Sequence, residues 1–164
     1  MARITWALLA GLFLLLPNGA YPIRAQGNKL KRALSLKLEV VHKAVRAGTE
    51  PRLRLTIENL SKADEKVLKP RGDLQDTYYR LVVSKDGKQL SLGAAISDPG
   101  PISEDDFLTL KPGKKVTFEF SRYAVAVHTL PAGQYQAQIR FWQDPYKSHT
   151  SAVLSPAATF KVEK

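Results

Sequence analysis

Apolar and polar residues alternate with a period of two along most of the chain after residue 33. In residues 34–41 a leucine or valine stands at every second position, and residues 135–142 repeat the pattern with Tyr, Ala, Ile and Phe. Such alternation is typical of strands that bury one face. Eight segments show it or are rich in strand-forming residues: 34–41, 52–58, 78–84, 89–92, 107–110, 116–121, 135–142 and 158–162. Short strands at this spacing, with no helical period outside the first 25 residues, predict an all-β sandwich or barrel.

Turn signals separate these segments. Asp86-Gly87 stands between two strand-like runs, and this dipeptide favours a type I′ hairpin because both of its residues need positive φ. Pro112-Gly113 fits the central positions of a type II turn. Two polar stretches, residues 62–76 and 93–106, contain proline and glycine and are predicted to be long connections.

The first 25 residues have the parts of a secretory signal peptide. A positive charge at Arg3 precedes an almost wholly apolar run over residues 4–16, and small residues follow Pro17. The run is shorter than the about 20 residues that span a bilayer, and a short core helix is the alternative. Cleavage is expected after Ala25, with Ala20 as the other candidate. The predicted organisation is therefore a signal peptide (1–25), a basic lead-in (26–33) and one sandwich domain (34–164).

Composition narrows the cellular setting. The 164 residues include no cysteine, which removes thiol chemistry, zinc–thiolate sites and a lipid anchor, and favours a bacterial periplasmic or secreted protein over an animal ectodomain. The net charge is +10, and removal of the leader leaves 23 basic and 15 acidic residues. The preferred interpretation of this charge is a solvated basic surface that aids solubility. The alternative is contact with anionic envelope polymers, whereas nucleic acid is a poor partner for a protein that leaves the cytoplasm.

Three segments resemble parts of immunoglobulin-like sandwiches in bacterial exported and inhibitor-type proteins. They are the strand end at residues 58–61, the turn at 110–113, and residues 130–135, which look like a tyrosine corner at Tyr135. The order of segments over residues 34–163 is similar to the intracellular proteinase inhibitor family of bacilli. This resemblance implies an immunoglobulin-like antiparallel sandwich of about seven to eight strands, and it carries over no inhibitory residue. The leader, the basic surface and the two long connections depart from that family.

Catalytic motifs are missing from the sequence. It contains no nucleophile elbow, zinc-protease motif or P-loop. The three histidines, His42, His128 and His149, fall in separate predicted turns or loops without metal-ligand spacing. We therefore expect neither an enzyme nor a bound cofactor or metal.

Two short motifs each have a functional and a structural interpretation. The acidic run Glu104–Asp106, with Asp98 nearby, offers oxygen ligands for calcium, although a solvated acidic loop has the same composition. Asn59-Leu60-Ser61 matches a glycosylation acceptor. In a bacterial protein we expect instead a strand-end turn in which the Asn59 side chain bonds local backbone.

Lys37, Arg52 and Arg54 form a candidate basic patch, because they fall on the polar side of the first two predicted strands. If those strands pair antiparallel, the three cations lie on one face and are suited to anionic glycans or phospholipid head groups. Glu39 and Glu58 lie on the same faces and dilute the charge, so a solvated exterior is the preferred interpretation of these residues.

The late loop over residues 144–156 is the other candidate binding surface. It contains Tyr146, Lys147 and His149, and end loops commonly carry function in sandwiches, as does the looser stretch 122–128. We therefore expect an exported, non-enzymatic binding or accessory protein of the bacterial envelope. Its partner would be a protein or an anionic polymer, held through end loops. The alternative is a secreted protease inhibitor that presents an exposed loop.

Overall fold

A computed structural model describes residues 33–93, 100–123, 125–143 and 152–164 of the chain. The predicted signal peptide (1–25) and all but the last residue of the basic lead-in (26–33) lie outside the described residues. Among the residues that are described, no helix has the length and apolar character needed to cross a membrane.

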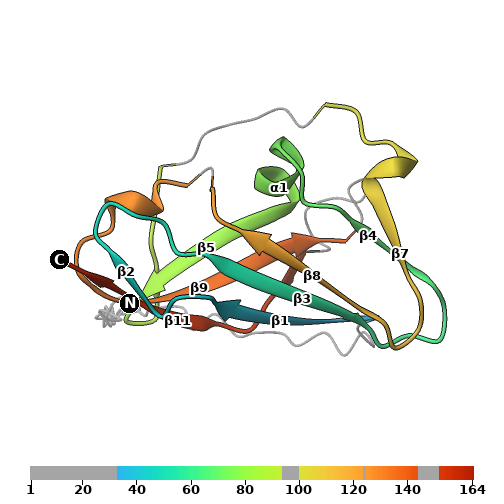
Figure 1. Ribbon diagram of the computed structural model, residues 1–164, viewed down its shortest axis with the longest axis horizontal. Coiled ribbons are helices and arrows are strands. Elements are labelled where there is room, and N and C mark those ends of the chain that lie inside the picture. The colour runs from blue at the N-terminus through green and yellow to red at the C-terminus, as the bar shows by residue number, and fades with distance from the viewer. Residues whose placement is uncertain (1–32, 94–99, 124, 144–151) are drawn as a thin grey trace, which may run out of the picture. The chain divides into compact units, whose positions relative to one another are not determined.

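Strands dominate the described part of the chain and form three sheets (Figure 1). The three-stranded sheet contains, in spatial order, β1 (Leu34–Val40), β3 (Leu53–Asn59) and β8 (Lys115–Phe120). The six-stranded sheet contains β2 (Ala44–Arg46), β11 (Ala158–Glu163), β9 (Gly133–Trp142), β5 (Tyr79–Lys85) and β6 (Lys88–Gln89), with β10 (Ala152–Leu154) paired to β9. The two-stranded sheet pairs β4 (Glu65–Leu68) with β7 (Phe107–Leu110). The helical elements are α1 (Asp73–Tyr78), η1 (Glu104–Asp106) and η2 (Val127–Thr129).

The core lies between the three-stranded and six-stranded sheets. Along β1, β3, β5 and β9 every second residue is buried except at the strand ends, while most of the residues between them are polar and face outward. Both sheets contribute to one cluster of buried side chains, which includes Leu36, Leu55, Ile57, Phe120, Leu81, Val83, Ile139, Phe141 and Phe160. Burying this apolar surface is the main force that holds the two layers together. The predicted all-β sandwich is confirmed.

The two predicted turns are confirmed. Asp86 and Gly87 both have positive φ, 50° and 75°, and Lys85 pairs with Lys88 across the resulting two-residue hairpin. Gly113 has φ 70°, and the Lys114 amide donates to the Lys111 carbonyl at 3.0 Å. Positive φ explains why glycine stands at the second position of both turns.

Part of the structure was not predicted. Residues 62–76, expected to be a connection, contain β4 and most of α1. The short strands β2 and β10 fall where a turn and a loop were expected. The ladders are antiparallel except that of β2, which pairs parallel with β11, with Ala44 opposite Lys161. Between β1 and β2 the chain therefore leaves the three-stranded sheet and joins the six-stranded one.

Asn59 stands at a corner where two strand pairs change sheet together. Asn59 ends β3, and the chain then continues into β4. The segment that pairs with both strands runs from β7, the partner of β4, into β8, the partner of β3. The Asn59 side chain is fully buried, donates to the carbonyls of Ala63 (2.8 Å) and Leu110 (2.7 Å), and accepts from the Ser61 amide (2.8 Å). The expected strand-end turn is confirmed. Both hydrogens of the Asn59 amide are engaged, so the glycosylation interpretation does not fit the folded chain.

Tyr135 makes the contact that the sequence predicts at the start of β9. Its hydroxyl donates to the Pro131 carbonyl at 2.7 Å, and its ring lies stacked with Phe160 of β11, 5.6 Å between centroids. The hydrogen bond fixes the entry of the chain into β9, the long central strand of the six-stranded sheet.

Candidate functional site

The predicted basic patch lies on the outward face of the three-stranded sheet. β1 and β3 pair antiparallel, as the patch requires, with Glu39 opposite Arg54. Arg54 in turn lies opposite Glu119 of β8, a strand that the patch prediction left out. The structure therefore brings Lys37, Arg52 and Arg54 to one face and places carboxylates among them.

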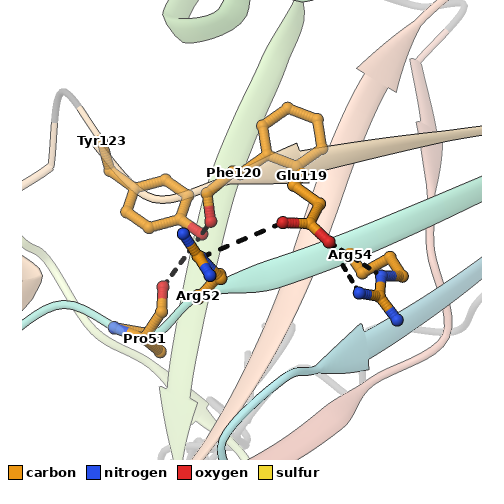
Figure 2. A network of polar contacts seen from close by, with 6 residues as sticks. All are labelled: Pro51, Arg52, Arg54, Glu119, Phe120 and Tyr123. Carbon is orange, nitrogen blue, oxygen red and sulfur yellow. Dashed lines mark hydrogen bonds and ion pairs between the residues drawn. The ribbon is translucent and has the colours of Figure 1, made fainter.

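Each of these three cations has an acidic partner. Arg54 Nη2 lies 2.6 Å from Glu119 Oε1, and Arg52 Nε lies 4.0 Å from the other oxygen of the same carboxylate (Figure 2). Lys37 Nζ lies 2.8 Å from Glu39 Oε1. The hydrogen bond from Arg54 holds the pKa of the Glu119 carboxyl below its ordinary value, and Lys37 does the same for Glu39. This face is therefore a set of ion pairs with little uncompensated charge to attract an anion.

The predicted loop residues Tyr146, Lys147 and His149 lie outside the described residues. Of the other two histidines, His42 is exposed in the turn after β1, and His128 Nδ1 lies 4.0 Å from a Glu50 carboxylate oxygen. Within the described ranges no three His, Asp or Glu side chains group together as metal ligands do.

The second predicted binding stretch, residues 122–128, is tied to the body of the sandwich. The Tyr123 hydroxyl donates to the carbonyls of Pro51 (3.2 Å) and Phe120 (3.0 Å), as Figure 2 shows. Val127 is buried, and Gln75 of α1 donates to the Arg122 carbonyl. These contacts hold the stretch against β3, β8 and α1 instead of presenting it as a free loop.

The acidic run at η1 is engaged by cations and by its own backbone. Asp106 is buried, accepts from the Ser103 amide (2.9 Å) and hydroxyl (3.1 Å), and pairs with Arg71. Glu104 lies 2.5 Å from Lys66 Nζ. These bonds engage two of the carboxylates that the calcium interpretation needs, those of Glu104 and Asp106, while Asp105 is exposed and Asp98 lies outside the described residues.

Asp106 should make the free energy of unfolding depend on pH in the acidic range. The Ser103 amide and, after it, Arg71 hold the Asp106 pKa below the ordinary 3.8 of an aspartate, because both favour the charged form. A lowered folded pKa gives stability that is present above the unfolded value and is lost as pH falls through the folded value. We expect Asp106→Asn to be less stable than wild type in urea unfolding at neutral pH, with the difference shrinking below about pH 4. A difference unchanged down to pH 2 would contradict this role.

An uncompensated pair of arginines lies on the opposite side of the sandwich. Arg80 of β5 and Arg140 of β9 are direct partners in the antiparallel ladder of the six-stranded sheet. Both face outward, because their neighbours Tyr79, Leu81 and Ile139 are buried in the core. Arg80 is exposed and Arg140 half-buried, and in the described part of the chain neither guanidinium has an ion pair or side-chain hydrogen bond.

A small hollow opens beside this arginine pair. It has a volume of about 220 Å³. Its polar lining residues are the two arginines, Gln89 and Ser91, and its other lining residues are leucines and valines of β5 and of residues 90–92, together with Val125. The chain after the Asp86-Gly87 hairpin forms its far wall, since the Leu90 amide donates to the Val83 carbonyl of β5 at 2.8 Å. The hairpin thus places two uncharged hydrogen-bonding side chains next to two positive charges.

The two positive charges repel each other and favour a bound anion. Like charges directly opposite one another in a ladder are unfavourable, by an amount within the roughly 0.2–1 kcal/mol range of cross-strand pairs. An anion between the two side chains removes that repulsion, and a guanidinium fork matches the oxygens of a carboxylate or phosphate. The arginine pair, Arg80 with Arg140, and its hollow can therefore hold an anionic group.

No protein-family model and no curated protein matches the chain. Among solved structures it is similar to a β-glucosidase from Listeria innocua (14% identity, TM-score 0.42), covering 80% of this chain and 16% of that one. The DNA glycosylase AlkC from Pseudomonas fluorescens aligns with 12% identity and a TM-score of 0.41, covering 80% and 31%. The sporulation control protein Spo0M from Bacillus subtilis aligns with 12% identity and a TM-score of 0.42, covering 80% and 50%. The chain thus spans half or less of the length of these three chains.

Proposed function

We propose that the protein is an exported, non-enzymatic binding module that holds an anionic polymer of the bacterial envelope on the outward face of its six-stranded sheet. One observation carries the proposal: Arg80 and Arg140 lie directly opposite each other without an acidic partner in the described residues. The binding surface proposed is thus a sheet face, whereas the sequence suggested end loops and the patch around Arg54. The inhibitor alternative rests on residues 144–156, and nothing in the described part of the chain favours it.

The two outward faces supply an internal comparison. On the three-stranded sheet Arg52 and Arg54 both pair with the Glu119 carboxylate, whereas Arg80 and Arg140 have no carboxylate partner among the described residues. Removing two arginines from either face changes the net charge by the same amount. A difference in binding between the two double variants therefore reports the site and not the overall charge.

Arg80→Gln/Arg140→Gln should bind polyanions about tenfold more weakly than wild type at roughly 0.1 M salt, where the Debye length is about 10 Å. Arg52→Gln/Arg54→Gln should stay within about twofold, because its arginines are already paired. The measurement is the Kd for hyaluronan, polygalacturonate and polyphosphate, each at two salt concentrations. Equal losses in the two double variants, or a wild type that binds none of the three polymers, would overturn the proposal.

The same variants give a second readout in urea unfolding. Each single change, Arg80→Gln or Arg140→Gln, should raise the free energy of unfolding by about 0.5 kcal/mol by relieving the repulsion. Arg54→Gln should not raise it, because that arginine is attracted to Glu119. A variant that is more stable than wild type but binds polyanions more weakly is still folded, so its weaker binding reports the loss of the arginine site.

A further inference from the structure

A row of glutamines continues from the arginine pair along β9. Gln138, Gln136 and Gln134 occupy the outward positions that follow Arg140 toward the start of the strand, between residues buried in the core. Gln134 and Gln136 are exposed, and within the described ranges their side chains have no hydrogen-bond partner. Gln138 Nε2 donates to the Ser155 carbonyl at 2.9 Å. Outward positions on a strand repeat about every 6.7 Å, so Gln134 lies about 20 Å from Arg140 along β9.

A second hollow lies at the far end of this row. It has a volume of about 480 Å³ and is lined by the polar residues Gln134, Thr159, Lys161 and Lys43 and by the apolar residues Ala44 and Phe160. Lys161 pairs with Glu163 at 3.0 Å, whereas Lys43 has no ion-pair partner in the described part of the chain. The Lys161 amide donates to the Lys43 carbonyl at 2.8 Å, which fixes the Lys43 backbone against β11. The glutamine row, Gln134 to Gln138, thus connects two separated positive sites.

The spacing of charge along this surface limits the kind of polymer that matches it. Each strand of a DNA duplex carries a negative charge about every 3.4 Å of the helix axis, and so about six over the roughly 20 Å between Arg140 and Gln134. The protein offers positive charge at the two ends and neutral amides between them. A glutamine amide both donates and accepts hydrogen bonds, as sugar hydroxyls do. The match is therefore to a hydroxyl-rich chain with sparse charges.

We infer that the polymer is an acidic polysaccharide in which uronic acids alternate with neutral sugars, extended along β9. This inference rests on the proposed function and adds the ligand class. A uronate carboxylate lies between Arg80 and Arg140, sugar hydroxyls bond the glutamine row, and the chain reaches Lys43. The arginine pair and the glutamine row lie on β5 and β9, and Lys43 is hydrogen-bonded to β11. The six-stranded sheet therefore fixes the spacing between the two ends of the site.

The experiment compares hyaluronan oligosaccharides from disaccharide to octasaccharide with polygalacturonate, polyphosphate and neutral dextran. Affinity should rise with oligosaccharide length until the chain spans the row, and the octasaccharide should bind more tightly than polyphosphate or dextran. Gln134→Ala/Gln136→Ala should weaken octasaccharide binding about tenfold, because two hydrogen-bonding side chains are lost, and should leave disaccharide binding unchanged. The control is Thr56→Ala/Thr117→Ala on the outward face of the other sheet, where the two hydroxyls bond each other at 3.1 Å.

The outcomes separate this inference from the proposed function. Three results would each overturn the inference that the ligand is an acidic polysaccharide. They are equal affinity for disaccharide and octasaccharide, a glutamine double variant that binds as wild type does, and a preference for polyphosphate. The proposed function survives those results if polyanion binding still depends on the arginine pair. If Arg80→Gln/Arg140→Gln binds every polyanion as wild type does, the proposed function fails and the polysaccharide with it.

Discussion

Asn59→Ala should lower the free energy of unfolding by about 3 kcal/mol, because the asparagine side chain joins the backbone of the turn after β3 to the backbone of β7 at a corner that water does not reach. Its two donor hydrogens engage the carbonyls of Ala63 and Leu110, and its oxygen engages the Ser61 amide. Alanine leaves the buried Leu110 carbonyl without this donor and removes the link between the β3–β8 and β4–β7 ladders. Urea unfolding followed by far-ultraviolet circular dichroism measures the effect.

Asn59→Asp sharpens this test. An aspartate keeps an acceptor for the Ser61 amide but has no hydrogen to donate, and it puts a charge in a fully buried position. We expect it to be at least as destabilising as alanine at neutral pH and to recover partly in acid, where the protonated carboxyl can donate. Ser61→Ala, at a hydroxyl bonded only in an exposed turn, serves as the control and should change stability by about 0.5 kcal/mol or less. An Asn59→Ala loss no larger than the control would show that the corner is held by other contacts.

Local chemistry made much of the fold predictable. The turns at Asp86-Gly87 and Pro112-Gly113 depend on φ values that short motifs encode, and the long strands depend on an alternation that a single buried face imposes. The elements missed, among them β2, β4 and α1, are three to six residues long. Their stability comes from partners distant in sequence, such as β7 for β4, so no local pattern marks them.

The candidate site was less predictable for the same reason. Alternation alone places Arg80 and Arg140 on outward positions, yet only the pairing and register of β5 with β9 make them direct partners. Conversely, Arg54 seemed to be part of an open basic patch because its partner, Glu119, belongs to a strand 65 residues away. A net charge counts such residues equally, and the fold decides which charges are compensated.

The contrast between the two outward faces connects stability with function. Ion pairs on the three-stranded sheet, such as Arg54 with Glu119, favour the folded chain without a ligand. The arginine pair disfavours it slightly, and a bound anion reverses the sign of that contribution. Ligand binding should therefore raise the unfolding midpoint of wild type more than that of Arg80→Gln/Arg140→Gln.

Tyr79 is the buried aromatic residue at which contacts from all three sheets meet. Its ring, 1% exposed, stacks on Phe141 at 4.8 Å in the six-stranded sheet and lies 5.5 Å from Phe120 in the three-stranded sheet. Its hydroxyl donates to the carbonyl of Leu68 in β4. Burial raises the pKa of the Tyr79 phenol far above its ordinary value, so the hydroxyl remains a donor even in alkaline solution.

Tyr79→Ala should therefore lower the free energy of unfolding by about 4 kcal/mol, through the cavity that it leaves between the sheets. Tyr79→Phe keeps the ring and removes only the donor to Leu68, so we expect about 2 kcal/mol from the unpaired buried carbonyl. Tyr123→Phe is the control, because the Tyr123 hydroxyl bonds carbonyls at a half-buried position and its loss should cost about 1 kcal/mol or less. If Tyr79→Phe were as stable as wild type, β4 would be held by its ladder with β7 alone. Both variants lack the hydroxyl, so the difference between them reports the ring. A difference of less than about 1 kcal/mol would mean that the aromatic contacts of Tyr79 contribute far less to stability than their burial implies.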